Sequence, residues 1–419
     1  MQHTQNRNLK TKTVLLAFAT LGALSFGCTK KNSNEIKVGV FGPFTGGSAP
    51  MGVSMRNGVQ IAIDEVNAAG GVMGKKLIMV DRDDEAKNER GGQIMQELLD
   101  KEQVAAVLGP INTGVANAST TYPLQKKVPQ IINVSAGAKV NELFKDYPEN
   151  YIFRIAANDD IQSKAIVAEG LKRGKKPALL CDDTNYGQNG CDKMTQALAA
   201  AGSKAVSVGK FKIKDTDMTA QLQEAKAAKA DVVLAYGIGP ELAAVSNSMD
   251  RINWKAPMIG SWTLSMSNYI INAGKNGNGT MMPQTFIESS ATSPKQKKFI
   301  EDYKAKFKES PIASAVSAAQ GYDSLYLLKL AIEQAQSADG KKIKEALENL
   351  NQPYEGLTGT FAKPFSSTDH EAIHEQNVLI GMVKDGTIVQ SGETSAAPVA
   401  APTAATAAAP AKSAKKKSK

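Results

Sequence analysis

Short apolar runs and longer segments with helical periodicity alternate along most of the chain. The runs at residues 36–40, 77–80, 104–108 and 130–133 are rich in β-branched residues and are bounded by glycine, proline or polar residues, which predicts buried strands. Between them, apolar positions recur at helical spacing. Ile61, Ile63 and Val66 form one such stripe, and Gly70 and Gly71 follow it as a helix terminator. Strands that alternate with helices predict a parallel sheet with helices on both faces.

The same alternation starts again after residues 151–154. Strands are predicted at residues 178–181, 205–208, 232–235 and 258–259, so a second α/β lobe of similar size follows the first. After Gly279 the pattern predicts helices at residues 295–307 and 313–335, and then strands at residues 355–361 and 377–383 in a late sheet segment. Because these elements come after two complete lobes, we expect the chain to cross between the lobes several times and to form a hinge there.

The first 27 residues have the composition of an export signal. Arg7, Lys10 and Lys12 precede an uncharged apolar run at residues 14–26 that is too short to span a bilayer comfortably. Gly27 and Cys28 then resemble the bacterial lipobox, although Ser25 stands where that pattern usually has leucine. We predict a signal peptide at residues 1–27, a lipid on Cys28, a spacer at residues 28–34 and a periplasmic or cell-surface location on a bacterial membrane. The alternative is a plain signal peptide that leaves Cys28 as a free thiol.

Most of the formal net charge of +9 lies at the two ends of the chain. Three positive charges fall in the predicted signal peptide and a net four fall in residues 393–419, which leaves +2 for residues 28–392. The nearly neutral body predicts no nucleic-acid partner. Residues 393–419 are rich in alanine and proline and end in lysines, so we predict a disordered tail; attraction to anionic lipid or cell-wall polymers is the alternative to a purely solvated role.

Two further cysteines, Cys181 and Cys191, lie ten residues apart. An oxidising compartment would permit a disulfide between them. They are predicted to lie at the end of a strand and on the next helix, however, where the geometry could forbid the bond. The sequence leaves a disulfide and two free thiols equally open.

Residues 370–374 read HEAIH and match the H-E-x-x-H pattern of zinc peptidases. Such a site needs a helix of several turns and a third ligand, yet this motif lies between a polar stretch at residues 366–369 and a predicted strand. We interpret it as a polar hairpin loop and predict no metal and no cofactor. An exported zinc enzyme that uses His370 and His374 is the less favoured alternative. Because neither a complete phosphate-binding loop nor a nucleophile elbow is present, the chain is predicted to be a binding protein, not an enzyme.

Small polar residues follow two neighbouring strands of the first lobe. The stretches are GPINTG at residues 109–114 and NVSAG at residues 133–137. Carboxyl ends of parallel strands meet at one edge of a sheet, where backbone amides of the following helices attract a carboxylate. The hydroxyls of Thr113 and Ser135 could add hydrogen bonds. Each stretch alone is an ordinary helix cap, but the pair predicts a binding site for a small anion.

The chain resembles the leucine/isoleucine/valine-binding family of periplasmic solute receptors over about residues 35–389. The resemblance rests on IKVGVFGPFTG, DEVNAAGGVMGKKL, VAAVLGPINTG, VPQIINVSAGA, Tyr186-Gly187 after ALLCDD, and GYDSLYLLKLAI. It implies a type I fold of two Rossmann-like lobes with parallel sheets, joined by a three-crossover hinge. It also implies closure of the lobes over a solute, and ABC permease subunits in the membrane as partners.

The resemblance implies that Thr113 and Ser135 hold a ligand carboxylate and that Tyr186 reaches it from the other lobe. The family's ammonium partners are absent: Gly137 replaces a hydroxyl residue and Trp262 replaces an acid. The expected aromatic wall is replaced near Met51 and Ile238. Asp159, Asp160 or Asp183 could supply the missing acid; otherwise the ligand is a deaminated or aromatic carboxylate, or an amide. The predicted ligand-binding residues are Met51, Asn112, Thr113, Ser135, Ala136, Gly137, Tyr186, Ile238 and Trp262.

These patterns predict a first lobe at residues 35–153 and 285–350, and a second lobe at residues 154–284 and 351–392. The predicted function is a lipid-anchored substrate-binding protein of an ABC importer for an amino acid or related small carboxylate. A ligand-sensing ectodomain that acts on a different membrane partner is the alternative.

Overall fold

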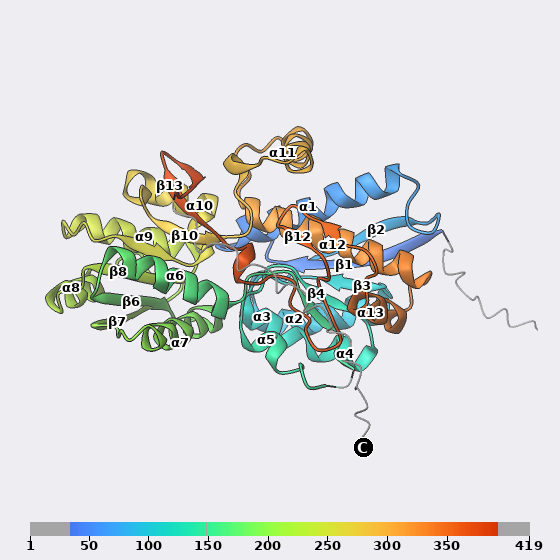
Figure 1. The fold of residues 1–419 in the computed structure, drawn as a ribbon, viewed down its shortest axis with the longest axis horizontal. Coiled ribbons are helices and arrows are strands. Elements are labelled where there is room, and N and C mark those ends of the chain that lie inside the picture. The colour runs from blue at the N-terminus through green and yellow to red at the C-terminus, as the bar shows by residue number, and fades with distance from the viewer. Residues whose placement is uncertain (1–33, 148, 393–419) are drawn as a thin grey trace, which may run out of the picture. The chain divides into compact units, whose positions relative to one another are not determined.

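The computed structural model describes residues 34–147 and 149–392. The predicted signal peptide, Cys28 and the tail from residue 393 lie outside the described residues. Two large sheets, each covered by helices, are visible in Figure 1. The strands are β1 (Glu35–Gly42), β2 (Lys76–Asp83), β3 (Ala106–Leu108), β4 (Gln130–Ile132), β5 (Ile152–Arg154), β6 (Pro177–Asp182), β7 (Ser207–Phe211), β8 (Val232–Tyr236), β9 (Met258–Gly260), β10 (Met281–Gln284), β11 (Tyr354–Glu355), β12 (Thr360–Phe361), β13 (Leu379–Lys384) and β14 (Thr387–Gln390).

Thirteen α-helices are assigned within the described residues. They are α1 (Ala49–Ala68), α2 (Asn88–Gln96), α3 (Thr113–Ser119), α4 (Thr121–Lys126), α5 (Lys139–Glu142), α6 (Asp159–Arg173), α7 (Asn185–Ala200), α8 (Thr219–Ala227), α9 (Gly239–Arg251), α10 (Ser267–Ala273), α11 (Pro294–Phe307), α12 (Ala315–Ala335) and α13 (Gly340–Glu348). None of the described helices is long and apolar enough to cross a membrane.

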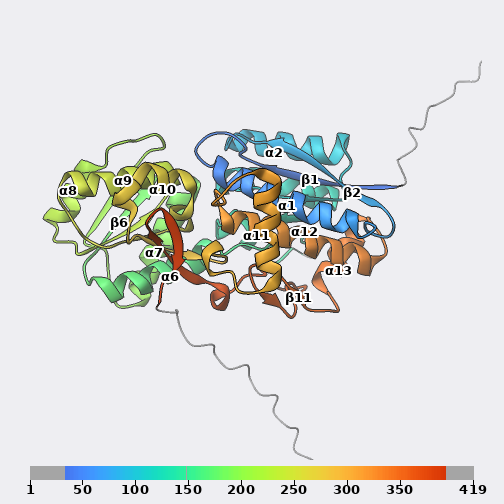
Figure 2. The ribbon, with the colours of Figure 1, turned by 90° about the horizontal axis from the view of Figure 1, so that it is seen from above.

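The first lobe is built on a five-stranded parallel sheet in the order β2-β1-β3-β4-β5. Successive residues of β1 point to opposite faces, so Val38 and Val40 pack with α1 and α12 while Phe41 packs with α2 and α3. Figure 2 shows α2 on one side of β1 and β2, and α1 and α12 on the other. Both faces are buried, which explains the continuous apolar runs of these strands.

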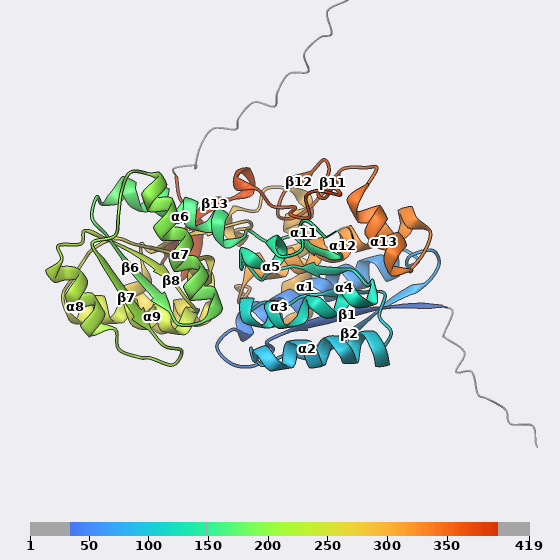
Figure 3. The same ribbon diagram turned by 90° about the horizontal axis from the view of Figure 1, so that it is seen from below.

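The second lobe is built on a seven-stranded sheet in the order β14-β13-β10-β9-β8-β6-β7. Strands β6 to β10 pair in parallel, whereas β13 pairs antiparallel to β10 and β14 pairs antiparallel to β13. Helices α6 and α7 pack on one face and α8 to α10 on the other. Figure 3 shows α6, α7, α8 and α9 around the strands β6, β7 and β8. The two α/β lobes with a parallel core confirm the predicted fold class.

The chain crosses between the lobes three times: after β5, after β10 and before β13. The expected return to the second lobe at residue 351 differs from the contacts. Buried Asp323 on α12 accepts hydrogen bonds from the Tyr354 hydroxyl at 2.7 Å and from the Leu357 and Thr358 amides at 2.8 and 2.9 Å. Residues 351–373 therefore pack on the first lobe, and the last crossover comes just before β13.

The carboxylate of Asp323 also explains why the strand predicted at residues 355–361 does not form. Residues 355–361, expected as one strand of a late sheet, form a separate two-stranded hairpin of β11 and β12. The backbone turns between them because Leu357 and Thr358 direct their amides to Asp323. The prediction of a continuous strand here was wrong, since a long-range hydrogen-bond acceptor overrides the local β-branched pattern.

Candidate functional site

A small cavity lies where strand ends of both lobes meet. Its wall from the first lobe consists of Ser48, Met51, Ile111, Asn112, Val134 and Ala136. Its wall from the second lobe consists of Tyr186, Ile238, Trp262, Thr263 and Met266. Every one of these residues follows the carboxyl end of a parallel strand or begins the next helix, which is where ligands bind in open α/β sheets. The space open to the centre of a water molecule is about 20 Å³, enough for one or two waters.

The structure brings six of the nine predicted ligand residues into this wall: Met51, Asn112, Ala136, Tyr186, Ile238 and Trp262. The other three, Thr113, Ser135 and Gly137, are immediate sequence neighbours of wall residues. Sequence reasoning missed Ser48, Ile111, Val134, Thr263 and Met266. Of these, Ile111 and Val134 lie inside the two stretches singled out from the sequence, so only their apolar character hid them.

Several buried polar atoms around the cavity have no hydrogen-bond partner. They are Asn112 Oδ1, Thr113 Oγ1, Ser135 Oγ and the Tyr186 hydroxyl. Thr113 is 1% exposed and Ser135 is fully buried. Burial and the charge of nearby Asp159 raise the pKa of Tyr186 well above 10, so its phenol stays protonated and can donate. Because a buried polar group without a partner costs about 1–3 kcal/mol, such a cluster favours a polar ligand.

The loop that carries Ser135 and Gly137 is held by Arg154. The Arg154 guanidinium, 1% exposed, donates to the Gly137 carbonyl at 2.7 Å and pairs with Glu371 at 2.5 Å. Gly137 has no room for a side chain, since a Cβ there would lie 2.3 Å from Thr113 Cγ2. Thr113 thus occupies the space that a hydroxyl-bearing residue at position 137 would need. The buried ion pair fixes the shape of this wall through residues far apart in sequence.

Asp159 lies directly behind the cavity wall. Its amide donates to the carbonyl of Ala136 at 2.7 Å, and its Oδ1 accepts from the Tyr236 hydroxyl at 2.7 Å. The Tyr236 ring in turn packs on the ring of Tyr186, with centroids 4.7 Å apart. The other carboxylate oxygen makes no hydrogen bond of normal geometry, although the Ala138 amide also faces the carboxylate and helps to lower its pKa. Burial raises the pKa of Asp159 to about 7, against a smaller lowering by Tyr236.

The other two candidate acids lie in different surroundings. Asp160 is about 41% exposed and pairs with Lys164 at 2.8 Å. Asp183 is exposed at the edge of the cleft. Of the three candidate acids, only Asp159 is buried.

Trp262 forms one wall of the cavity and is 2% exposed. Its amide donates to Gln162 Oε1 at 3.2 Å, and its carbonyl accepts from Gln284 Nε2 at 3.2 Å. Gln162 also donates to the carbonyl of Ala157 at 2.8 Å, in the first crossover. The indole thus fills space between the lobes, and its backbone is tied to the crossovers on which the lobes would turn.

Cys181 and Cys191 form a disulfide with Cα atoms 6.0 Å apart. The bond joins the end of β6 to the second turn of α7, and the segment that it closes includes Tyr186 in the first turn of that helix. Within this segment the Thr184 hydroxyl accepts from the Gly187 amide at 3.1 Å and caps α7. The sequence left the bond open because it did not show that the first turns of α7 return over the strand end.

The HEAIH segment is structural. His370 is buried, its ring stacks on Phe153 at 4.0 Å, and its two nitrogens contact the Ile152 carbonyl at 2.8 Å and Glu348 at 3.0 Å. Glu371 is engaged by Arg154, and the described backbone here is not helical. It is not the hairpin loop that we expected either, because its backbone pairs with β5 through Arg154. Within the described residues, no group of three or more metal-ligating side chains is found.

The sequence profile of the periplasmic binding protein family matches residues 35–387. The chain belongs to this family. Periplasmic binding proteins are solute receptors that do not catalyse reactions, so the predictions of family and of a non-enzymatic protein are confirmed.

Similar periplasmic binding proteins are known in several bacteria. The Leu/Ile/Val-binding protein homolog 3 of Brucella melitensis is 26% identical over 84% of this chain and 92% of its own length. The leucine-, isoleucine-, valine-, threonine-, and alanine-binding protein of Pseudomonas aeruginosa is 25% identical over 79% of this chain and 86% of its own length. The crystal structure of a type 1 periplasmic binding protein from Bordetella pertussis Tohama I has a TM-score of 0.77 and 26% identity, covering 85% of this chain and 99% of that one.

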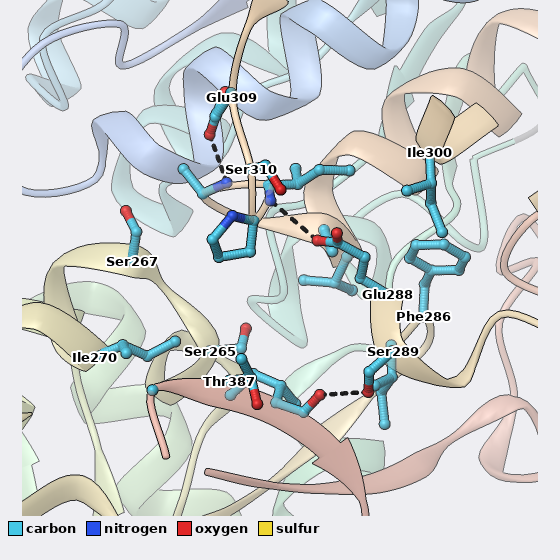
Figure 4. Close-up of a pocket in the computed structure, with 18 of the residues that line it drawn as sticks. Ser265, Ser267, Ile270, Phe286, Glu288, Ser289, Ile300, Glu309, Ser310 and Thr387 are labelled. Carbon is cyan, nitrogen blue, oxygen red and sulfur yellow. Dashed lines mark hydrogen bonds between the residues drawn. The ribbon is translucent and has the colours of Figure 1, made fainter. Parts of the chain in front are cut away.

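A larger cavity of about 720 Å³ lies beside the second crossover, between α10, α11 and the turn from β13 to β14 (Figure 4). Many of its wall residues are aliphatic, and both of its carboxylates are already paired. Glu288 accepts from the Ile312 amide at 3.0 Å and pairs with Lys304 at 2.5 Å. Glu309 accepts from the Ala313 amide at 2.5 Å. Because the unpartnered buried atoms surround the smaller cavity and not this one, the smaller cavity is the better candidate for the ligand site of this periplasmic binding protein.

Proposed function

We propose that the protein is the receptor of an ABC importer and binds an α-amino acid with an aliphatic side chain between its lobes. The observation that carries this proposal is the unpartnered carboxylate oxygen of buried Asp159, placed behind the part of the cavity wall that Ala136 forms. An ammonium group would supply the missing partner and would lower the cost of burying the charge. The hydroxyls of Thr113, Ser135 and Tyr186 would donate to the ligand carboxylate.

The names of the relatives agree with this ligand class: the Pseudomonas aeruginosa protein is named as a leucine-, isoleucine-, valine-, threonine-, and alanine-binding protein, and the Brucella melitensis protein as a Leu/Ile/Val-binding protein homolog. We also propose that a lipid on Cys28 anchors the receptor to the membrane, as the lipobox-like sequence indicates. The cavity as it stands is too small for an amino acid, so entry requires the lobes to part or the indole of Trp262 to move.

The side chain of Trp262 favours a second candidate for the ligand, a carboxylate without an ammonium group. An indole in the cleft, where the family has an acid, would suit the planar face of an aromatic or deaminated carboxylate. In that case Asp159 would have to bind the ligand in its protonated form. The two candidates differ in whether the ligand carries a positive charge.

Calorimetric titration of the purified protein with L-leucine and with 4-methylpentanoate, its deaminated analogue, tests the proposal. We expect leucine to bind and the analogue to bind at least tenfold more weakly, because the analogue leaves Asp159 without a partner. Asp159→Asn keeps the acceptor for Tyr236 but removes the charge, and it should weaken leucine binding by roughly 30-fold, or about 2 kcal/mol. The matched control is Asp160→Asn, which changes an exposed acid one residue away.

Equal binding of leucine and its analogue, or unchanged leucine binding in Asp159→Asn, would contradict the amino-acid proposal. Tighter binding of the analogue, or of benzoate, would establish the second candidate instead.

A further inference from the structure

A second pocket lies next to the small cavity between the lobes, which we now call the ligand cavity, and shares Asn112 and Tyr186 with it. We call this second pocket the mouth pocket. It is lined by the starts of three helices: α2 with Lys87 and Asn88, α3 with Asn112 and Thr113, and α7 with Asn185 and Gln188. The space open to the centre of a water molecule is about 410 Å³, some twenty times that of the ligand cavity. Because α7 belongs to the second lobe and α2 and α3 to the first, closure of the lobes would enclose anything held there.

The lining of the mouth pocket is polar but carries no uniform charge. Carboxamides and hydroxyls dominate it, and its charged groups are of both signs. Lys87 already pairs with Glu85 at 2.7 Å. The Gln188 side chain donates to the Asp183 carbonyl at 2.7 Å, which directs its carboxamide along the rim. Asn88 reaches across to α3, where a Cβ on Gly114 would lie 2.2 Å from Asn88 Oδ1. Groups of this kind recognise amides better than they recognise ions.

Buried polar atoms without partners mark the junction of the two cavities. Asn112 and Tyr186 line both cavities, and Thr113 lines the mouth pocket. Asn112 Oδ1, Thr113 Oγ1 and the Tyr186 hydroxyl are all buried and unpartnered. The carboxylate of a free amino acid could accept from the two hydroxyls, but it has no hydrogen to donate to Asn112 Oδ1, whereas a ligand with an amide N–H at this junction could satisfy all three atoms.

The positions of Asp159 and Thr113 determine which end of such a ligand faces the mouth pocket. Asp159 lies behind Ala136 and the Tyr186–Tyr236 ring pair, and the mouth pocket does not include it. The ligand ammonium therefore points inward and the carboxyl end points to Thr113 and the mouth pocket. We propose that the preferred ligand is an amino acid extended at its carboxyl end through an amide bond, as in a short peptide with an aliphatic first residue. This inference rests on the proposed amino-acid function and names the larger substrate class of the same site.

Calorimetric titration with L-leucine, L-leucylglycine and glycyl-L-leucine tests the inference. Leucylglycine should bind about tenfold more tightly than leucine, because one or two added hydrogen bonds contribute about 1 kcal/mol each. Glycylleucine should bind at least tenfold more weakly than leucylglycine, because its extension lies on the amino side, where Asp159 and Tyr236 leave no open space. Asn88→Ala and Gln188→Ala should remove the advantage of leucylglycine and change leucine binding less than about twofold.

The matched control is Gln196→Ala, an exposed glutamine further along α7. Thermal unfolding of all variants checks that none loses its fold. Leucine binding that equals or exceeds leucylglycine binding would overturn this inference and leave the amino-acid function standing. Failure of both ligands to bind would overturn the amino-acid function as well.

Discussion

At the scale of single residues, the charge state of Asp159 links ligand binding to pH. Burial raises its pKa to about 7, so the carboxyl group holds a proton in the unliganded protein at pH 5.5. An ammonium ligand needs the ionised form, and binding must then release that proton. Because half of the carboxyl groups are already protonated at pH 7, we expect the affinity for leucine to fall roughly 15-fold between pH 7 and 5.5, to approach a tenfold loss per unit below that, and to change little above pH 8. Calorimetry at a series of pH values measures this, and Asp159→Asn should flatten the profile.

The raised pKa of Asp159 has the opposite effect on the stability of the unliganded protein, which decreases as pH rises. The pKa of this carboxyl group is higher in the folded protein than its unfolded value of 3.8. Its contribution to the free energy of unfolding is therefore largest below pH 4 and is lost as pH rises to the folded pKa. Burial also raises the pKa of Asp84 to about 7 and that of Asp182 to about 6. Thermal unfolding of the unliganded protein should therefore shift to lower temperature between pH 5 and 8. A rise over this interval would show that these groups do not bind protons as the buried geometry requires.

At the scale of elements, the disulfide holds the loop between β6 and α7 in place. Replacing both Cys181 and Cys191 by alanine removes a crosslink that closes a loop of about ten residues, which should lower the free energy of unfolding by about 3 kcal/mol. Leucine binding should weaken too, because the segment closed by the disulfide includes Tyr186, in the first turn of α7, which lines the cavity. Denaturant unfolding and calorimetry of the double variant measure the two effects. A lower free energy of unfolding with unchanged leucine affinity would show that the disulfide stabilises the fold but does not influence the position of Tyr186.

The elements also show how far sequence reasoning reaches. Of strands β1 to β9, all except β5 were predicted to within a few residues, because strands buried on both faces must be continuously apolar. Two loops of the site followed from that, since the ends of parallel strands meet at one edge. Asp159 was not placed, because an acid at a helix start is ordinary until Tyr236 and Ala136 are seen to enclose it. HEAIH and residues 355–361 were misleading, since Arg154 and Asp323, remote in sequence, determine their backbone.

At the scale of the whole receptor, function requires that ligand and lobe closure favour each other. A ligand that contacts both lobes stabilises the closed arrangement by the difference between its two affinities. The ligand cavity meets this condition, since Met51 and Ala136 belong to one lobe and Ile238 and Trp262 to the other. Contacts between the lobes that do not involve ligand should then also change the apparent affinity.

One such contact joins α10 of the second lobe to the loop before α1. Asn268 Nδ2 donates to the Gly47 carbonyl at 2.8 Å. Removing it with Asn268→Ala should disfavour closure by about 1 kcal/mol and weaken ligand binding about fivefold, although Asn268 does not line the ligand cavity. Asn272→Ala, on the exposed side of the same helix, is the matched control and should leave the affinity unchanged. Calorimetry gives the affinities, and small-angle scattering without ligand should show a larger radius of gyration for Asn268→Ala than for the control. If both variants bind as the wild type does, this contact forms no part of the closure equilibrium, and the energy of closing must come from the ligand and the hinge.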